Sequence, residues 1–199
     1  MTQVAGRPLR ADARRNRERV LTAAREVFAE HGREAQMDDV ARRAEVGVGT
    51  VYRHFPTKEA LIDALVAEAF ERLLVVAKEQ ALREDDAWDA LETTLWAGAE
   101  ILAGDRAVSA IMSEVYGPVN VDLDLQLQMT ETMSGMVDRA RAAGTLRQDV
   151  ILDDIPMVMC GIGMATCKPH QMSDAWKRHV AIVIDGLRAA NASGPLPTT

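Results

Sequence analysis

The sequence predicts an all-α protein, and three observations lead to this fold class. Ala, Leu, Glu and Arg, which have high helix propensity, are abundant along the 199 residues. Aromatic residues make up only 4% of the chain, and runs that alternate apolar and polar residues, as strands do, are rare. At 48%, the apolar fraction can fill the core of one compact domain or of two small ones.

The first two expected helices lie within the first 44 residues. Apolar residues recur at helical spacing over residues 12–31, and the following Gly32 suits the position after a helix C-terminus. A second pattern, only two turns long, starts at Met37. Asp38 and Asp39 lie in its first turn, where the helix dipole favours negative charge.

The third and fourth expected helices meet at a proline. A third helix is expected over residues 48–54, because Pro56 disfavours helical geometry at Phe55. Thr57 is a suitable N-cap for a long fourth helix that should reach about Glu84. The second and third helices are too short to be stable alone, so we expect them to pack against the first and the fourth.

The third helix should have one packed face and one exposed face. At 100° per residue, the face expected to anchor it in the core carries Val48, Val51, Tyr52 and Phe55. The opposite face presents small and hydrogen-bonding groups, namely Gly49, Thr50, Arg53 and His54. A short helix with such a face, held by a helix-turn-helix, is typical of proteins that read the major groove of DNA.

Charge is distributed unevenly along the chain. The net charge is −7, but residues 1–60 hold 12 Arg and Lys against 9 Asp and Glu, whereas the remaining 139 residues hold 11 against 21. Because local potential decides what a surface attracts, the N-terminal part is the candidate for binding a polyanion. No apolar run approaches the roughly 18 residues of a membrane-spanning helix, so we expect a cytoplasmic protein.

The run MDDVARRAEVGVGTVYRHFPTKEALI, residues 37–62, resembles the DNA-binding signature of the TetR family of bacterial transcriptional regulators. The resemblance extends over about residues 12–65. Three positions depart from the family pattern: Gln36 replaces the usual Thr, Glu45 the usual Gly and Gly47 the usual Ser. The resemblance implies a dimeric DNA-binding regulator, most often a repressor, that binds a palindromic operator and is released by a small-molecule effector.

This resemblance also implies an architecture of about nine helices in two domains. Residues 1–57 would form an N-terminal arm and a three-helix helix-turn-helix domain, and residues 58–191 a helical effector-binding and dimerisation domain. Residues 192–199 are expected to be a disordered tail. The alternative is a DNA-binding regulator without an effector, which would have a filled core.

The candidate DNA-binding residues are Gly49, Thr50, Tyr52, Arg53, His54, Lys58, Arg7 and Arg10. Arg53 and Thr50 could reach base edges, since Arg binds guanine O6 and N7 and the Thr methyl suits thymine. Tyr52 and His54 are expected to hold phosphates. Lys58 would meet a phosphate at the start of the fourth helix, or else be a solvated lysine. Arg7 and Arg10 would follow the minor groove from a flexible arm, or belong to a disordered basic tail.

The last two helices are the candidate dimerisation module. The first of them, over residues 155–167, is apolar on nearly every side and therefore needs neighbours all round. The next should open at Ser173 and carry an apolar stripe. Two such helices from each of two chains would form a four-helix interface, with a monomer of unusually deep core as the alternative. The expected interface residues are Met157, Ile162, Trp176, Val180, Val183, Ile184 and Leu187.

Residues 85–150 are where an effector pocket is expected. Large or flexible apolar residues suit an adaptable binding site, although ordinary core packing is the alternative for each of them. The candidates are Trp88, Trp96, Met112, Met129, Met133 and Met136. The stretch 119–129 alternates as a strand would, but no second alternating run could pair with it. We therefore predict a helix there, continuing to about Ala143.

Enzyme chemistry finds no support in the sequence. There is no G-x-S-x-G elbow, phosphate-binding glycine loop or H-E-x-x-H zinc pair. We expect no enzyme, no cofactor and no metal. Cys160, Cys167 and His170 have a loosely metal-like order, so a metal or thiol sensor is kept as a less favoured alternative.

Overall fold

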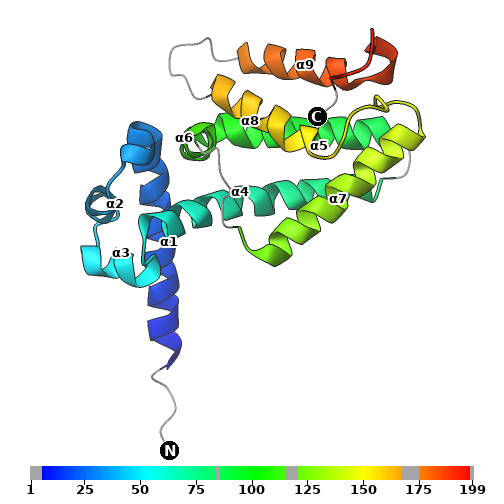
Figure 1. Cartoon of the computed structure of the whole chain (residues 1–199). Helices are drawn as coiled ribbons and strands as arrows, with labels where there is room; N and C mark the ends of the chain where they lie inside the picture. Colours follow the sequence, from blue (N-terminus) through cyan, green and yellow to red (C-terminus); the bar gives the residue numbers. More distant parts are fainter. Residues whose placement is uncertain (1–5, 84–85, 115–120, 167–174, 198–199) are drawn as a thin grey trace, which may run out of the picture.

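The computed structural model describes residues 6–83, 86–114, 121–166 and 175–197, and within them it confirms the all-α class (Figure 1). Short 3₁₀ helices follow the first and last α-helices, over Gly32–Glu34 and Ala189–Asn191. None of the described helices is long and apolar enough to cross a membrane. The α-helices of these ranges are α1 Gly6–His31, α2 Met37–Arg43, α3 Val48–His54, α4 Lys58–Ala81, α5 Ala87–Gly104, α6 Arg106–Glu114, α7 Leu123–Ala142, α8 Asp154–Thr166 and α9 Ala175–Leu187.

Helix α3 and the start of α4 lie where the sequence predicts them, although α4 ends at Ala81 rather than near Glu84. Helix α3 covers the predicted residues and stops where Phe55 adopts an extended conformation before Pro56. Helix α4 is capped by Thr57, whose Oγ1 accepts a hydrogen bond from the backbone N–H of Ala60 at 3.0 Å. The cap fixes the point at which the chain leaves the helix-turn-helix and enters the long helix.

Helix α1 differs from the prediction at its start. It begins at Gly6 rather than near residue 12, so Arg7 and Arg10 lie in a helix and not on a flexible arm. Their side chains are outside the described part of the structure. The apolar pattern could not reveal this extension, because Leu9 is the only large apolar residue in the added stretch 6–11 and cannot by itself form a helical stripe.

The alternating stretch before Met129 is helical from Leu123 onward, as predicted, but residues 121–122, which were also predicted to be helical, precede the helix. Residues 119–120 lie outside the described ranges. Burial explains why the helix is preferred. Leu125, Met129 and Met133 recur every four residues on the buried face, whereas the alternating Leu123 and Leu127 are 67% and 59% exposed. A strand would have placed all five on the same side.

The helices form two regions that share a continuous core. Helices α1 to α3 lie at one end of the molecule, and α4 runs from them into the bundle of α5, α7, α8 and α9 (Figure 1). Phe28 of α1 and Leu61 and Leu65 of α4 belong to the same buried cluster as Leu91 of α5. Helix α1 also packs against α6, so the N-terminal region contacts the bundle along two helices.

The C-terminal segment is described as far as Pro197, and it contacts the loop before α8. The Arg147 guanidinium donates a hydrogen bond to the carbonyl of Gly194 at 2.7 Å, and Asp149 accepts one from the backbone N–H of Leu196 at 2.7 Å. The hydrogen bonds from Arg147 and then from Leu196 hold the pKa of Asp149 well below the usual carboxyl range. These contacts tie the tail to the loop before α8.

Candidate DNA-binding surface and effector cavity

Helix α3 is anchored by a narrower face than its sequence predicts. Val51 is fully buried and Phe55 is 3% exposed, but Val48 and Tyr52 are 42% and 47% exposed. The prediction that Val48 and Tyr52 help to anchor the helix is therefore wrong. Helix α3 packs against α2 and α1 along one edge only, which leaves room for two anchors. Its exposed surface is wider as a result.

The side chains expected to meet DNA lie on this outer surface. Gly49 and Arg53 are exposed, and Thr50 and His54 are half-buried beside them. Among the described residues, Arg53 has no hydrogen bond or ion pair, whereas the neighbouring Arg42 pairs with Asp39 on its own helix at 2.9 Å. The Arg53 guanidinium is thus available to an external partner.

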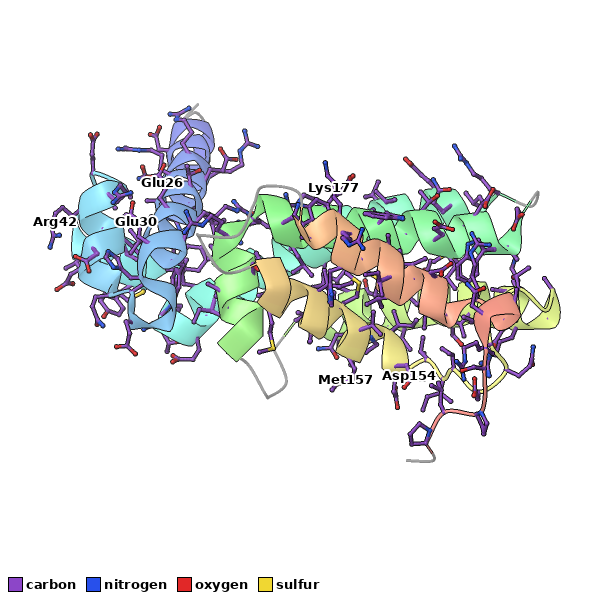
Figure 2. The ribbon with its side chains drawn as sticks, turned by 90° about the horizontal axis from the view of Figure 1, so that it is seen from above. Glu26, Glu30, Arg42, Asp154, Met157 and Lys177 are labelled. Atoms are coloured by element: carbon purple, nitrogen blue, oxygen red, sulfur yellow. The ribbon has the colours of Figure 1, made fainter. Side chains whose placement is uncertain are left out.

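Contacts to α1 hold α3 in place. The guanidinium of Arg17 lies over the Phe55 ring, 5.4 Å from its centroid. Arg43 of α2 forms salt bridges with Glu26 and Glu30, which extend from α1 (Figure 2), at 2.9 and 3.0 Å. These hydrogen bonds, that to Glu30 first, raise the pKa of Arg43 above its ordinary value. The exposed face of α3 is therefore carried on a braced three-helix unit.

The turn between α2 and α3 contains the one described non-glycine residue with a left-handed backbone. Glu45 has φ of 53°, a conformation that costs a residue with a Cβ roughly 1–2 kcal/mol. Its carboxylate lies 3.5 Å from the Arg19 guanidinium, an exposed pair that contributes little. Arg19 also donates a hydrogen bond to the carbonyl of Ala44 at 2.7 Å, independently of the Glu45 side chain.

Replacing Glu45 by Gly should therefore stabilise the protein by about 1 kcal/mol, because glycine adopts positive φ without strain. The change should raise Tm by roughly 2–4 °C in thermal unfolding followed by circular dichroism. Glu45→Ala is the matched control: it removes the same carboxylate but keeps the strained Cβ. Equal Tm values for the glycine and alanine variants would refute this account of the turn.

A cavity of about 370 Å³ lies inside the helical bundle, between α4, α5, α6, α7 and α8. Met129 and Met133 of α7 line it, as do Phe70 of α4 and Met159 and Cys160 of α8. The volume falls within the usual range of roughly 300–1,000 Å³ for small-molecule sites. Most of the lining is apolar, so the cavity suits a ligand with an apolar body.

Three other residues proposed for the pocket lie elsewhere. Trp88 and Met136 are 2% and 1% exposed and belong to the core without lining the cavity. Trp88 donates a hydrogen bond to Glu92 and lies under the guanidinium of Arg188, 4.4 Å from the ring centroid. Trp96 packs edge-on against Trp176 of α9 with centroids 6.2 Å apart, also away from the cavity. The side chain of Met112 lies outside the described residues.

The cavity lining that sequence analysis missed comes from several helices at once. Phe70, Thr94, Asp153 and Met159 contribute to it, although no periodicity in any one helix marks them. Cys160 also lines it, while Cys167 and His170, its proposed metal partners, fall outside the described ranges. Within those ranges no three His, Cys, Asp or Glu residues are grouped so that they could hold a metal ion.

A chain of polar contacts connects the cavity to the helix-turn-helix. Val108 of α6 lines the cavity, and its backbone N–H donates to Asp105 at 3.2 Å. Asp105 is 8% exposed and accepts hydrogen bonds from Arg25 of α1 at 3.1 Å and from Arg72 of α4 at 3.3 Å. Arg25 also pairs with Glu68. Burial lowers the pKa of Arg25, but the hydrogen bonds to Glu68 and Asp105 outweigh it and raise the pKa.

Helices α8 and α9 pack side by side on one side of the bundle (Figure 2). Four residues proposed for the subunit interface, Ile162, Val180, Ile184 and Leu187, are at most 8% exposed, so their side chains belong to the core of the chain itself. A single apolar stripe in the sequence does not tell which neighbour covers it. Trp176 and Val183 are half-buried. Three apolar residues of the two helices face outward: Met157, Met164 and Ile182 are 71%, 50% and 61% exposed.

The fold and the exposed face of α3 define a class of protein: a helix-turn-helix protein with a separate helical bundle that contains a cavity. Two family models match the chain: "Bacterial regulatory proteins, tetR family" over residues 20–65 and "Transcriptional regulator SbtR-like, C-terminal domain" over residues 86–189, the latter more than half of the chain. The chain belongs to the TetR family of bacterial transcriptional regulators. Members of this family are DNA-binding regulators and not enzymes.

Individual relatives agree with this membership. The HTH-type transcriptional regulator UidR of Escherichia coli K12 is 39% identical over 72 residues, which span 36% of this chain and 37% of that protein. The chain thus matches little more than a third of the length of such curated relatives. A TetR regulator structure from Mycobacterium vanbaalenii is 33% identical, with a TM-score of 0.56 over 91% of this chain and 99% of the other. One from Streptomyces coelicolor is 30% identical, with a TM-score of 0.55 and coverage of 86% and 98%.

Proposed function

We propose that this protein is a repressor that binds a palindromic operator as a homodimer and is released when a small molecule occupies the cavity between α4 and α8. The observation that carries the proposal is the outer face of α3, where Arg53 is exposed and has no partner among the described residues, beside Thr50 and His54. A braced helix with such a face fits the major groove, in which Arg reads guanine.

A dimer is part of the proposal because one short helix reads only a few base pairs. Two copies of α3, separated by about one helical turn of DNA, would read two half-sites of a palindrome. The outward-facing Met157, Met164 and Ile182 on α8 and α9 favour the pairing of these two helices with those of a second chain. An isologous contact of this kind produces the two-fold symmetry that a palindrome requires.

Communication between cavity and DNA would run through α6. An occupant that displaces Val108 would also move the α6 backbone bonded to Asp105, and through Asp105 the Arg25 side chain on α1. Because α1 braces α2 and α3, a small movement there would change the distance between the two recognition helices of a dimer. A coupling free energy of roughly 1–3 kcal/mol suffices for a modest response.

The direct test is a titration of the protein with labelled duplex from its own upstream region, against a random duplex of equal length. The proposal predicts tighter binding to the upstream duplex and an affinity that falls steeply as salt rises, since phosphate contacts release counterions. Equal affinity for both duplexes at every salt concentration would reject the sequence-specific regulator.

A bulky residue at position 98 should close the cavity. A Cβ built on Gly98 would lie 2.8 Å from the Met159 Cε and 3.6 Å from Leu73, so a leucine there must occupy cavity space. We expect Gly98→Leu to weaken binding of Nile red, an uncharged dye that fluoresces in apolar surroundings, by roughly ten-fold or more. Fluorescence titration measures the effect.

The matched control for this variant is Gly135→Leu. Gly135 lies within α7 and a Cβ there meets nothing within 4 Å, so the same substitution in a helix should leave dye binding unchanged. If Gly98→Leu and Gly135→Leu bind the dye as tightly as the original protein, the cavity is not the binding site. The effector-independent alternative would then be favoured.

A further inference from the structure

The charge of the cavity lining restricts which ligands it can hold. Asp153, in the loop just before α8, is the only charged residue among the described lining residues, and no Lys, Arg or His lines the cavity there. Within the described part of the chain, the Asp153 carboxylate has no hydrogen bond or salt bridge. The cavity therefore combines an apolar interior with an unpaired negative charge at its exposed rim.

The N-terminus of α8, which borders the cavity, does not offer an anion site beside Asp153. A helix N-terminus normally offers free backbone N–H groups to negative ligands. Here the N–H of Asp154 donates to the carbonyl of Ile151 and that of Ile155 to the carbonyl of Leu152, both at 3.1 Å. Pro156, the next lining residue, has no N–H. The first-turn donors nearest the cavity are thus already used or missing.

The other polar groups of the lining are neutral, and two of them are already hydrogen-bonded within the chain. The Thr94 hydroxyl donates to the carbonyl of Ala90 at 2.9 Å, and the Gln126 amide donates to the carbonyl of Val121 at 2.8 Å. Their oxygens remain able to accept hydrogen bonds from a ligand. The Thr130 hydroxyl and the Cys160 thiol can donate as well as accept, but no charged donor lines the cavity among the described residues. A ligand carboxylate or phosphate therefore finds no counter-charge there, whereas a protonated amine finds the Asp153 carboxylate.

The wider charge distribution acts in the same direction. Residues 61–199, which contain the entire cavity lining, hold 11 Arg and Lys against 21 Asp and Glu. A negative surface raises the local concentration of cations and lowers that of anions.

We propose that the effector is a hydrophobic organic cation, with an apolar body among Phe70, Met129 and Met159 and an ammonium group at Asp153. The inference rests on the proposed function, because it names the ligand class of the same cavity. Met side chains adapt to irregular apolar shapes, and the Phe70 ring offers a face that a cation can approach. The carboxylate at the rim would decide the sign of the ligand charge.

The test compares ligands that share one body and differ only in the head group. Phenylhexylamine, phenylhexanol and phenylhexanoate are titrated into the full chain by isothermal titration calorimetry. The amine should bind most tightly and the carboxylate least. Asp153→Asn should weaken amine binding by about five-fold, as expected for a partly exposed ion pair, and should leave phenylhexanol binding unchanged.

Asp122→Asn is the matched control. Asp122 is an exposed carboxylate that precedes α7, makes no side-chain capping hydrogen bond and does not line the cavity. The amine should bind this variant as tightly as it binds the original protein. If both variants lose the same amount of amine affinity, the effect comes from the overall negative charge of the surface, and the proposed role of Asp153 is overturned.

Two further outcomes separate this inference from the proposed function. If the amine and the alcohol bind equally well and Asp153→Asn changes neither, the cation preference is overturned while the cavity remains an apolar ligand site. If none of the three compounds binds, the inference falls together with the effector cavity. Upstream DNA binding, measured without ligand, tests the α3 surface independently of either result.

Discussion

Arg53→Ala is expected to weaken binding to the upstream operator by roughly ten- to a hundred-fold. The guanidinium is exposed on the outer face of α3 and has no partner in the described residues, so its removal leaves the fold intact and takes away a contact to DNA. If Arg53 contacts guanine O6 and N7, the variant should also discriminate less between operator and random duplex. Fluorescence anisotropy with both duplexes measures the two effects together.

Two other arginine and lysine changes serve as references. Arg141→Ala removes the same charge from the last turn of α7, where Arg141 pairs with Asp138 at 2.9 Å. This end of α7 lies away from α3 (Figure 1), so operator affinity should stay unchanged. Lys58→Ala changes the first residue of α4. It should weaken binding to operator and random duplexes alike, and reduce the slope of log affinity against log salt concentration by about one. Unchanged affinity in Arg53→Ala would remove α3 from the interface with DNA.

Met157→Lys is expected to convert the protein to monomers and to reduce operator affinity by about a hundred-fold or more. Met157 is 71% exposed in the single chain, on the side of α8 that we propose to meet its symmetry mate (Figure 2). Because a two-fold axis repeats every change, two ammonium groups would have to be buried near each other. A monomer presents one recognition helix, which loses the contribution of the second half-site. Analytical ultracentrifugation and anisotropy give the two readouts.

Val75→Lys controls for the added charge. Val75 is 59% exposed on α4, outside the two helices of the proposed interface, so this variant should remain dimeric and bind the operator normally. A dimer that persists in Met157→Lys with full operator affinity would contradict the proposed interface. Loss of the dimer in both variants would show a general effect of charge.

The ends and types of several helices could be predicted because they depend on residues close together in the sequence. Pro56 and Thr57 fix the junction between α3 and α4 through backbone geometry and a capping hydrogen bond, and both effects depend on a few adjacent residues. The four-residue spacing of Leu125, Met129 and Met133 likewise selected a helix over a strand. In each case the information lies within about two turns of chain.

The burial of individual side chains and the position of the cavity depend on tertiary packing, which the sequence pattern does not indicate. Val48 and Tyr52 have the spacing of core residues but remain exposed, because no neighbouring helix covers that side of α3. Ile162 and Val180 could equally have faced a partner or their own chain, and the fold turns them inward. The cavity is assembled from five helices, so no single stretch of sequence indicates it.

The central claim is that the outer face of α3 enters the major groove twice per operator. Hydroxyl-radical footprinting of the upstream region with the purified protein tests it most directly. The account predicts two protected stretches related by two-fold symmetry, with centres about one helical turn (roughly 34 Å) apart, and their loss in Arg53→Ala. A single protected stretch, or protection that Arg53→Ala leaves unchanged, would contradict it.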